Sequence, residues 1–259
     1  MNKFPLQIKV NLQQWIYLGV VIIGTVSIFV SNTFAFHRSD SASYADRWWS
    51  KDDSDDGRKY NPNYHDYTNE GGDCANYVSQ CLRDNDAGGL NLSAGPGVDD
   101  WGCIPLCENL HTHLINNQYV EYSFISNNGS PPDNLTTGDV IIFGGYNPND
   151  SYEHAVIVVG GSGNSCIVDS HTTDHQNIRW NYGFPNYWTE ARFYHIPDAR
   201  VTSTTPDNES TGAGIDTNIV INFSKPMDIT SVENAFSIYP DIQGEFSWSN
   251  NNRTLTFTP

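Results

Sequence analysis

The chain has 259 residues, of which 38% are hydrophobic and 13% aromatic, enough for one large domain or two ordinary ones. Lys and Arg total 13 against 30 Asp and Glu, so the formal net charge is −17. A negatively charged protein does not attract the phosphate backbone of a nucleic acid, so we do not expect nucleic acid as a partner. The charge fits a solvated extracellular surface and does not name a substrate.

The N-terminal segment, residues 1–36, predicts an export signal or an N-terminal anchor. Two lysines precede an uncharged apolar run at 15–30, and Thr33 and Ala35 are small residues suited to a cleavage site. The run approaches the roughly 20 residues that span a bilayer, so an uncleaved anchor remains the alternative. Either way we expect a secreted or cell-wall-associated protein, with the membrane as a partner only if this segment is retained.

The polar segment after the first expected helix raises the question of a bound metal. SYADRWW, from residue 43, predicts the start of that helix, and the acidic run that follows predicts a surface loop. Asp52 and Asp56 resemble the start of a calcium loop, but Asn63 stands where a bidentate Glu completes such loops. The two His-rich stretches, HTH and HTTDH, lack the partners of a zinc motif. Calcium at Asp52–Asp56 stays open, and we expect no cofactor.

The middle of the chain predicts an α+β domain over residues 41–197. A short helix is expected from Cys74 to Asp84, because this segment lacks Gly and Pro, Asp73 can cap it and AGG follows it. Short β-branched or aromatic runs separated by Gly, Asn and Pro turns predict consecutive antiparallel strands at 136–145, 153–161, 165–171 and 191–196. A helix followed by a meandering sheet indicates this fold class.

The composition changes after Pro197. Residues 198–212 are rich in Thr, Ser and Gly and predict a linker. Residues 213–259 predict strands without a helix between them, and SNNNRT, at 249–254, predicts a hairpin turn. These features predict a small Ig-like β-sandwich. Because such domains run to roughly 100 residues, the sequence leaves open whether the domain is complete at Pro259.

Cys74, in the stretch GGDCANYVSQC, is the candidate nucleophile. A thiolate attacks and a thiol does not, and the unpaired N–H groups of a first helical turn lower a thiol pKa. Gly71 and Gly72 allow a tight turn and the close approach of a substrate, and N–H groups of that turn are candidates to stabilise an oxyanion. This position suits attack on an amide carbonyl.

A cysteine nucleophile needs a base, and His154 is the best-placed histidine because it opens an apolar strand that would hold it firmly. The turn at 160–164 would fold the next strand back, which makes Asp169 the candidate for orienting the imidazole. His171 and Asp174 stay open as alternatives, because a one-residue slip in register exchanges the two faces of a strand.

The five cysteines also allow a structural interpretation. In an exported protein two disulfides among Cys74, Cys81, Cys103, Cys107 and Cys166 would leave one thiol, but spacing does not assign the connectivity. A Cys74–Cys81 bridge is excluded if the helix is real, since two helical turns separate their Cα atoms by roughly 10 Å. A bridge from Cys74 to another cysteine stays open.

Seven segments in order resemble the bacterial family called "Putative amidase domain": YADRWW, NPNYHDY, GGDCANYVSQCL, GDVIIF, EHAVIV, VDSHTTD and ARFYHI. The resemblance covers about residues 41–197. It implies a papain-like cysteine hydrolase related to the CHAP and NlpC-type cell-wall enzymes, with Cys74 as nucleophile, His154 as base and a polar third residue on the following strand. Ala75 and Tyr77 replace the Thr and Phe usual in that family. GAGIDTNIVINFSKPMD and RTLTFTP resemble bacterial Ig-like modules.

Together these observations predict an exported cysteine-dependent amide hydrolase that acts through an acyl-enzyme thioester. The expected substrate is peptidoglycan, cut as a muramoyl-peptide amidase or as a peptide endopeptidase. One alternative is a secreted thiol protease or acyltransferase acting on other amides. Another is a non-catalytic cell-surface binding or adhesion protein. The sequence does not assign an oligomeric state.

Overall fold

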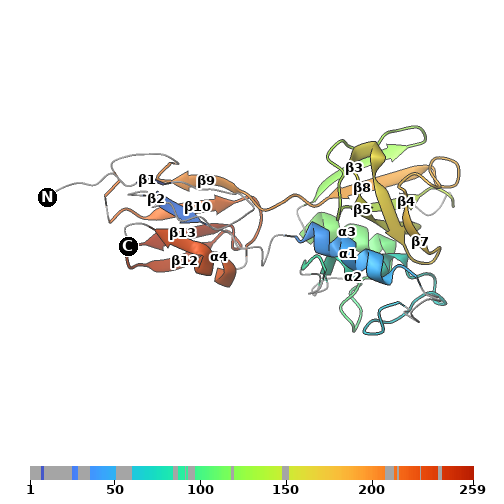
Figure 1. The fold of residues 1–259 in the computed structure, drawn as a ribbon, viewed down its shortest axis with the longest axis horizontal. Coiled ribbons are helices and arrows are strands. Elements are labelled where there is room, and N and C mark those ends of the chain that lie inside the picture. Colours follow the sequence, from blue (N-terminus) through green and yellow to red (C-terminus); the bar gives the residue numbers. More distant parts are fainter. Residues whose placement is uncertain are drawn as a thin grey trace. The chain divides into compact units, whose positions relative to one another are not determined.

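The chain divides into two compact units, residues 36–197 and residues 198–259 together with 1–35. The computed structural model describes residues 7–8, 25–28, 36–50, 60–83, 87–90, 92, 97–117, 120–147, 152–207, 213–214, 216–227, 229–238 and 241–259. We call the first unit the α+β unit and the second the Ig-like unit, and describe each by itself (Figure 1). The candidate calcium residues Asp52–Asp56 lie outside the described residues.

A six-stranded antiparallel sheet forms the centre of the α+β unit, in the order β3-β8-β4-β5-β6-β7. The four predicted strands are confirmed, and two polar edge strands that were not predicted flank them. The bounds are β3 Glu121–Ser126, β4 Val140–Gly144, β5 His154–Gly160, β6 Ile167–Ser170, β7 His175–Arg179 and β8 Glu190–His195.

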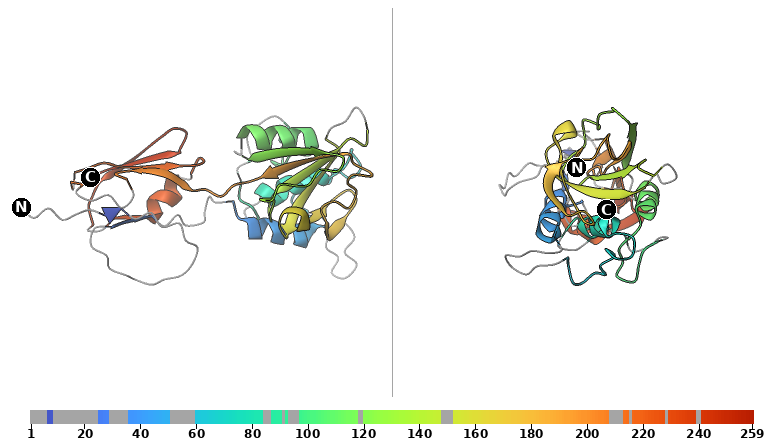
Figure 2. Two further views of the ribbon diagram at one scale, coloured as in Figure 1. Left: turned by 90° about the horizontal axis from the view of Figure 1, so that it is seen from above. Right: turned by 90° about the vertical axis from the view of Figure 1, so that its right-hand side faces the viewer.

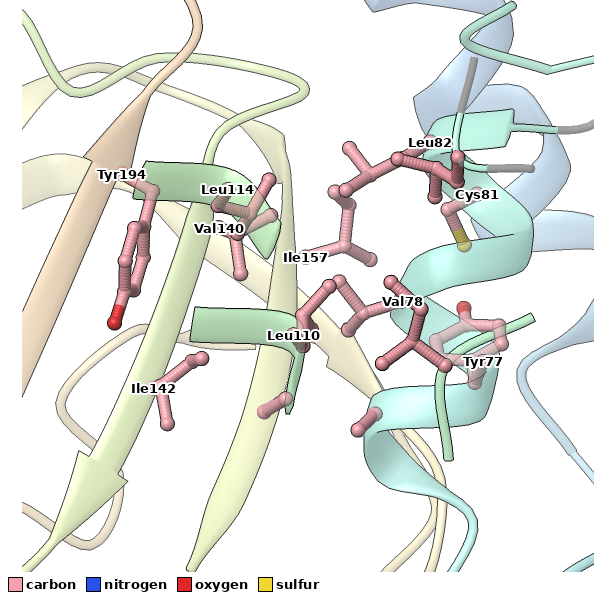
Figure 3. Packing of buried hydrophobic residues seen from close by; sticks show 14 of the residues in the cluster. Tyr77, Val78, Cys81, Leu82, Leu110, Leu114, Val140, Ile142, Ile157 and Tyr194 are labelled. Atoms are coloured by element: carbon pink, nitrogen blue, oxygen red, sulfur yellow. The ribbon is translucent and has the colours of Figure 1, made fainter. Parts of the chain in front are cut away.

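Three helices pack against one face of this sheet: α1 Arg38–Trp48, α2 Cys74–Arg83 and α3 Cys107–Asn117. Figure 1 shows α1 and α2 running side by side. Alternate residues of β4 and β5 face these helices, and Figure 3 shows how the apolar side of α2 meets them. The buried side chains drawn there include Val78, Leu82, Leu110, Leu114, Val140, Ile142 and Ile157. The expected α2 is confirmed, and α3 was not predicted.

The other face of the sheet is covered by the segment between β7 and β8. Phe143 and Val156 alternate with the helix-facing residues and pack against Trp180, Phe184 and Trp188 from that segment. Each face of β4 and β5 therefore buries apolar side chains, which explains why these strands are continuous hydrophobic runs in the sequence. The α+β fold class with an antiparallel sheet is confirmed.

A buried carboxylate joins the beginning and the end of the α+β unit. Asp139 Oδ1 accepts hydrogen bonds from Arg38 Nη1 at 2.8 Å and from the Ile196 N–H at 3.1 Å. Its Oδ2 accepts from the Thr136 N–H at 2.9 Å and lies 2.8 Å from His195 Nδ1. Asp139 is completely buried and holds the turn before β4, as expected of a structural residue rather than a catalytic acid.

The Ig-like unit contains a four-stranded sheet in the order β12-β13-β10-β9. A second sheet pairs β1 Gln7–Ile8 and β2 Thr25–Ile28 with β11 Phe236–Ile238. The bounds of the other elements are β9 Val201–Thr205, β10 Ile219–Phe223, α4 Ile229–Ala235, β12 Glu245–Ser249 and β13 Thr254–Thr258. Figure 2 shows α4 and β2 on one side of the four-stranded sheet, as expected for a layered arrangement.

Two details of the Ig-like unit differ from expectation. Residues Val201–Thr205 lie in the predicted linker but form a strand, because Thr and Val suit a strand that pairs with β10. A short helix, α4, interrupts the predicted run of strands. The predicted hairpin is confirmed, since Ser249 pairs with Thr254 and Asn250, Asn251 and Asn252 all adopt positive φ angles.

The expected export signal stays a prediction, since most of the apolar run lies outside the described residues. Four of its residues form β2 and pair with β11. In the part of the chain that the structure describes, no helix has the length and apolarity to cross a bilayer.

Candidate active site

Cys74 is the first residue of α2, as the sequence predicts. The backbone before it makes a tight turn, with φ angles of 117° at Gly71 and 119° at Gly72. A side chain at either position would be strained, and one at Gly72 would also press on the Thr172 hydroxyl at 3.2 Å. The two glycines therefore bring the chain into α2 with Cys74 at the first turn, where backbone N–H groups favour a thiolate.

Asp73 holds this turn from the position before the helix. Its Oδ1 accepts hydrogen bonds from the Tyr67 N–H and from Asn76 Nδ2, both at 2.8 Å. Its own N–H donates to Thr172 Oγ1 at 2.7 Å, which links the turn to the connection between β6 and β7. The side chain and main chain of Asp73 thus tie the start of α2 to the segment before it and to the connection between β6 and β7.

A buried histidine completes this support. His171 Nδ1 lies 2.6 Å from Asp73 Oδ2, and Nε2 lies 2.6 Å from the Trp48 carbonyl oxygen. The imidazole is stacked between the rings of Tyr60 and Tyr77, with centroids 3.5 and 3.8 Å away. Both ring nitrogens face acceptors, so His171 ties the Asp73 carboxylate to the Trp48 carbonyl in a buried contact. His171 is therefore part of the scaffold under Cys74.

The Cys74 sulfur lies against two other functional groups. Its Sγ is 3.7 Å from Sγ of Cys107, the first residue of α3. The Cys107 thiol lowers the pKa of Cys74 most, and the hydrogen bond and charge of His154 lower it further, while burial opposes the shift. The net direction is well below the usual thiol pKa. The structure thus brings together Cys74 and His154, the two residues that the sequence selects first.

His154 lies at the first position of β5 and is held by an aromatic ring. Its imidazole stacks on Trp188 at a centroid distance of 5.1 Å and an interplanar angle of 1°, and Tyr182 meets it edge-on at 6.5 Å. His154 is 5% exposed, and its Nε2 has no hydrogen-bond partner. This leaves Nδ1 as the nitrogen that hydrogen-bonds Cys74, while Nε2 makes no hydrogen bond.

Asp169 does not lie beside His154, which is a correction to the sequence-based assignment. It pairs with Ile157 of β5, three residues beyond His154, and side chains alternate between the faces of a strand. Its Oδ1 accepts from the Asn177 N–H at 2.6 Å, and its Oδ2 has no partner. Burial, with a contribution from Asp46, raises the pKa of Asp169 to about 7 although the Asn177 hydrogen bond opposes this.

The physical reason for this correction lies in the register. A β-bulge between Val158 and Gly160 shifts the pairing, and β6 ends at Ser170 before reaching His154. The two alternatives occupy other positions as well: His171 supports Asp73, and Asp174 accepts a hydrogen bond from the Tyr60 hydroxyl.

The cysteines do not follow the expected disulfide pattern. All five lie in the part of the chain that the structure describes, and each carries a buried, reduced thiol. Burial raises the pKa of Cys103 and of Cys166 to about 12 in each case. The pKa of Cys74 is lowered, whereas those of Cys103 and Cys166 are raised. The sequence left one free thiol after two disulfides, but the structure has five free thiols.

Sequence reasoning missed three residues of the site: Cys107, Trp188 and Tyr182. The Tyr182 hydroxyl is buried without a partner, and the charge of Cys74 contributes to raising its pKa after burial. Pro105, two residues before Cys107, was a signal for a helix start. Nothing in the sequence around Trp188 or Tyr182 indicates their proximity to His154, because tertiary folding creates it.

The site has no obvious place for a metal ion. Over the described residues, no group of three or more His, Cys, Asp or Glu side chains is arranged to hold one. The chemistry of the site is that of a thiol beside an imidazole, in a setting of aromatic rings and backbone N–H groups.

Comparison with known proteins relates this site to a family. Residues 35–196 match the model of the family described as "Putative amidase domain", and residues 197–259 match that of a bacterial Ig-like domain. The boundary agrees with the two compact units. The Ig-like match is compatible with a surface or extracellular protein.

Individual relatives add little detail. The chain is 25% identical over 175 residues to the uncharacterized protein YhbB of Bacillus subtilis strain 168, over 64% of this chain and 51% of that protein. It thus spans about half the length of this curated relative. The crystal structure of Ly7917 aligns over 85% of this chain and 91% of that one at 10% identity, and its TM-score of 0.25 carries no argument about the fold. With more than half of its residues matched, the chain belongs to the family called "Putative amidase domain", a match that suggests amide hydrolysis, and it carries a bacterial Ig-like domain after it.

Proposed function

We propose that the α+β unit is a papain-like, cysteine-dependent amide hydrolase. The observation that carries this proposal is the place of Cys74: the first turn of a buried helix, with its sulfur served by His154 and its pKa lowered. A thiolate at neutral pH together with an imidazole is the pair needed to attack an amide and release the amine. The family match supports amide hydrolysis but not this mechanism.

In this mechanism His154 takes the Cys74 thiol proton, and the sulfur attacks the amide carbonyl carbon. The oxyanion that forms is stabilised by backbone N–H groups of the first turn of α2, since the Gly72 and Asp73 N–H groups already donate to the Tyr67 carbonyl and to Thr172 Oγ1. As the C–N bond breaks, His154 gives the proton to the leaving amine, and a thioester remains on Cys74. Water then attacks the thioester with His154 as base, which releases the acid and restores the thiol.

The sequence predicts that a third residue hydrogen-bonds His154, but Nε2 of His154 has no hydrogen-bond partner in the structure. Asp169 lies on β6 opposite Ile157, three residues beyond His154, and does not orient this nitrogen. The stack on Trp188 restricts the imidazole plane instead, and the Tyr182 ring meets the imidazole edge-on. We propose that Trp188 is the main positioning residue for His154 and that a water or substrate atom fills the Nε2 position.

We propose peptidoglycan as the substrate and export as the route by which the protein reaches it. Two features support this part: the apolar run at 15–30 has the character of an export signal, and bacterial Ig-like domains suit a surface protein. In this arrangement the Ig-like unit acts as a spacer or adhesion module. Both muramoyl-peptide amidase and endopeptidase activity fit the site, since the geometry concerns the carbonyl and not its neighbours.

The test compares the full chain with its Cys74→Ala and Cys81→Ala variants on purified peptidoglycan under reducing conditions. Mass spectrometry of the solubilised fragments identifies the new amine and carboxylate, and so the bond that is cut. We expect fragments from the unsubstituted chain and from Cys81→Ala, and none from Cys74→Ala. Equal release by Cys74→Ala would reject the cysteine mechanism. Cleavage of unrelated peptide amides with intact peptidoglycan would reject only the substrate.

A further inference from the structure

The first residues of α2 and α3 are both cysteines, and their sulfurs are in contact. The Cys74 and Cys107 sulfurs lie 3.7 Å apart, where a disulfide bond needs about 2.05 Å. Closing the gap requires an approach of roughly 1.7 Å, which small rotations of two side chains supply. The two helices that begin with these cysteines, α2 and α3, already pack against each other.

The neighbouring thiols are less suited to this reaction. Cys81 is two helical turns from Cys74, and burial raises its pKa well above the usual value. Cys103 precedes Cys107 by four residues, and burial raises its pKa to about 12. A thiol in these states contains little thiolate at neutral pH, and only a thiolate attacks a disulfide. The contact between the two sulfurs, together with the raised pKa values of Cys81 and Cys103, therefore favours Cys74 and Cys107 as the pair.

The pair keeps a small exposed surface. Cys74 retains 7% of its surface and Cys107 retains 8%, whereas Cys81, Cys103 and Cys166 are completely covered. Cys74 and Cys107 are thus the two cysteines that keep some contact with solvent. A site that admits an amide substrate to Cys74 also admits a small oxidant to the same sulfur.

We propose that Cys74 and Cys107 form a reversible disulfide, a modification site that removes the nucleophile when a low-molecular-weight disulfide is present. In the first step the Cys74 thiolate attacks one sulfur of the oxidant, such as oxidised glutathione, and releases one thiol. In the second step Cys107 attacks the Cys74 sulfur and releases the second thiol. Two electrons pass from the two cysteines to the oxidant, and their two protons end on the released thiols.

The crosslink would join the starts of α2 and α3 and leave no sulfur to attack a carbonyl. It does not depend on the proposed function, because its formation needs no substrate and is read without an activity assay. Where the proposed function also holds, the reduced chain is the active form and the crosslinked chain is inactive.

The test treats the full chain with oxidised glutathione and measures its intact mass. We expect the unsubstituted chain to lose the mass of two hydrogen atoms and its reactive thiols in denaturant to fall from five to three, with full recovery after dithiothreitol. The Cys107→Ser variant should retain one glutathione on Cys74. The Cys103→Ser variant is the matched control from the same segment, and should crosslink like the unsubstituted chain.

Trypsin does not separate Cys103, Cys107 and Cys166, because no Lys or Arg lies between residues 84 and 178. Fragment-ion sequencing of the crosslinked peptide from the unsubstituted chain therefore identifies the partner of Cys74 even if Cys107→Ser fails to fold. A stable glutathione adduct on Cys74 without a crosslink would overturn the proposal. So would a crosslink that persists in Cys107→Ser or maps to another cysteine.

Discussion

Cys74 and Cys81 lie on the same helix, both are buried, and their thiols are opposite in character. Burial raises the pKa of Cys81 well above the usual value, and the charge of Asp169 adds to this. At Cys74 the same penalty of burial is outweighed by Cys107 and His154. Figure 3 shows Cys81 beside Val78 and Leu82 in the apolar packing between α2 and the sheet.

The difference teaches that burial alone does not decide whether a cysteine is reactive. At the first turn of α2 the polar neighbours Cys107 and His154 outweigh burial, while around Cys81 burial and the charge of Asp169 outweigh the hydrogen bond with Tyr77. One helix thus carries a candidate nucleophile and an inert packing residue. The predictions below change the groups that create this contrast.

The largest expected effect is on amide hydrolysis. Cys74→Ala should lower the rate by at least about 10³-fold, because it removes the attacking atom, whereas Cys81→Ala should stay within a few-fold of the unsubstituted chain. Initial rates on the substrate identified by fragment analysis measure both. Residual activity in Cys74→Ala above one tenth of the original would exclude Cys74 as nucleophile.

The second effect concerns the support beneath Cys74. His171→Gln breaks the buried pair with Asp73 and leaves a carboxylate without its partner, so we expect a loss of about 3 kcal/mol in unfolding free energy. Denaturant titration followed by tryptophan fluorescence measures it. His65→Gln is the matched control, since its pair with Glu70 is solvent-exposed and should be worth less than about 1 kcal/mol. Equal losses in the two variants would contradict the supporting role of His171.

The third effect separates the two thiols by reactivity. At pH 7 iodoacetamide should alkylate Cys74 on the order of 10² times faster than Cys81, and the half-maximal pH for Cys74 should lie below about 8.5. The sign follows from the lowered pKa of Cys74, since the thiolate then persists to lower pH. Peptide mapping after timed quenching gives both rates. Cys107→Ala should move the half-maximal pH upward, and an unchanged value would remove Cys107 as a cause.

The smallest effect tests Asp169, the residue whose position differs from the sequence-based assignment. Its pKa is raised to about 7, so the folded state holds a proton that the unfolded state has released above about pH 4. This contribution to stability is present at low pH and is lost as the pH rises through about 7. We expect a loss of roughly 2 kcal/mol between pH 5 and 8, and Asp169→Asn should remove this pH dependence.

Activity gives Asp169 a second readout. Asp169→Asn keeps an oxygen that accepts from the Asn177 N–H, so we expect a folded chain with a rate close to that of the unsubstituted one. A fall in kcat of about 10³-fold or more in a folded variant would restore Asp169 as a catalytic partner of His154.

The sequence predicts the α+β fold and its main helix because the signals are local. The cap and glycines around Cys74, and the apolar runs of β4 and β5, specify these elements without tertiary information. The edge strand β7 has the polar sequence HQNIR, and α3 mixes polar and apolar residues, so neither gives a clear period. These elements form because the rest of the sheet and α2 provide a surface for them.

Of the residues in the candidate site, the sequence predicts Cys74 and His154 but not the others. A helix start and a strand start can be read from local patterns, but the third contact depends on the register of a four-residue strand. β5 continues to Gly160 and β6 begins only at Ile167, so Asp169 lies opposite Ile157 and not beside His154, and no residue type in the hairpin predicts this register. Cys107 and Trp188 reach the site from distant segments, which a single sequence does not reveal.

The hydrogen bonds around Asp139 have a topological consequence. Arg38 and Ile196 stand at opposite ends of the α+β unit in the chain, and both bind the same carboxylate. A domain whose ends meet can be circularly permuted, with a short peptide closing the old termini and new ones opened in the exposed turn at 127–130. Because its ends lie close together, such a domain can also be inserted into another protein without forcing the two insertion points apart. The α+β unit therefore has the geometry of a domain that can be transferred between proteins.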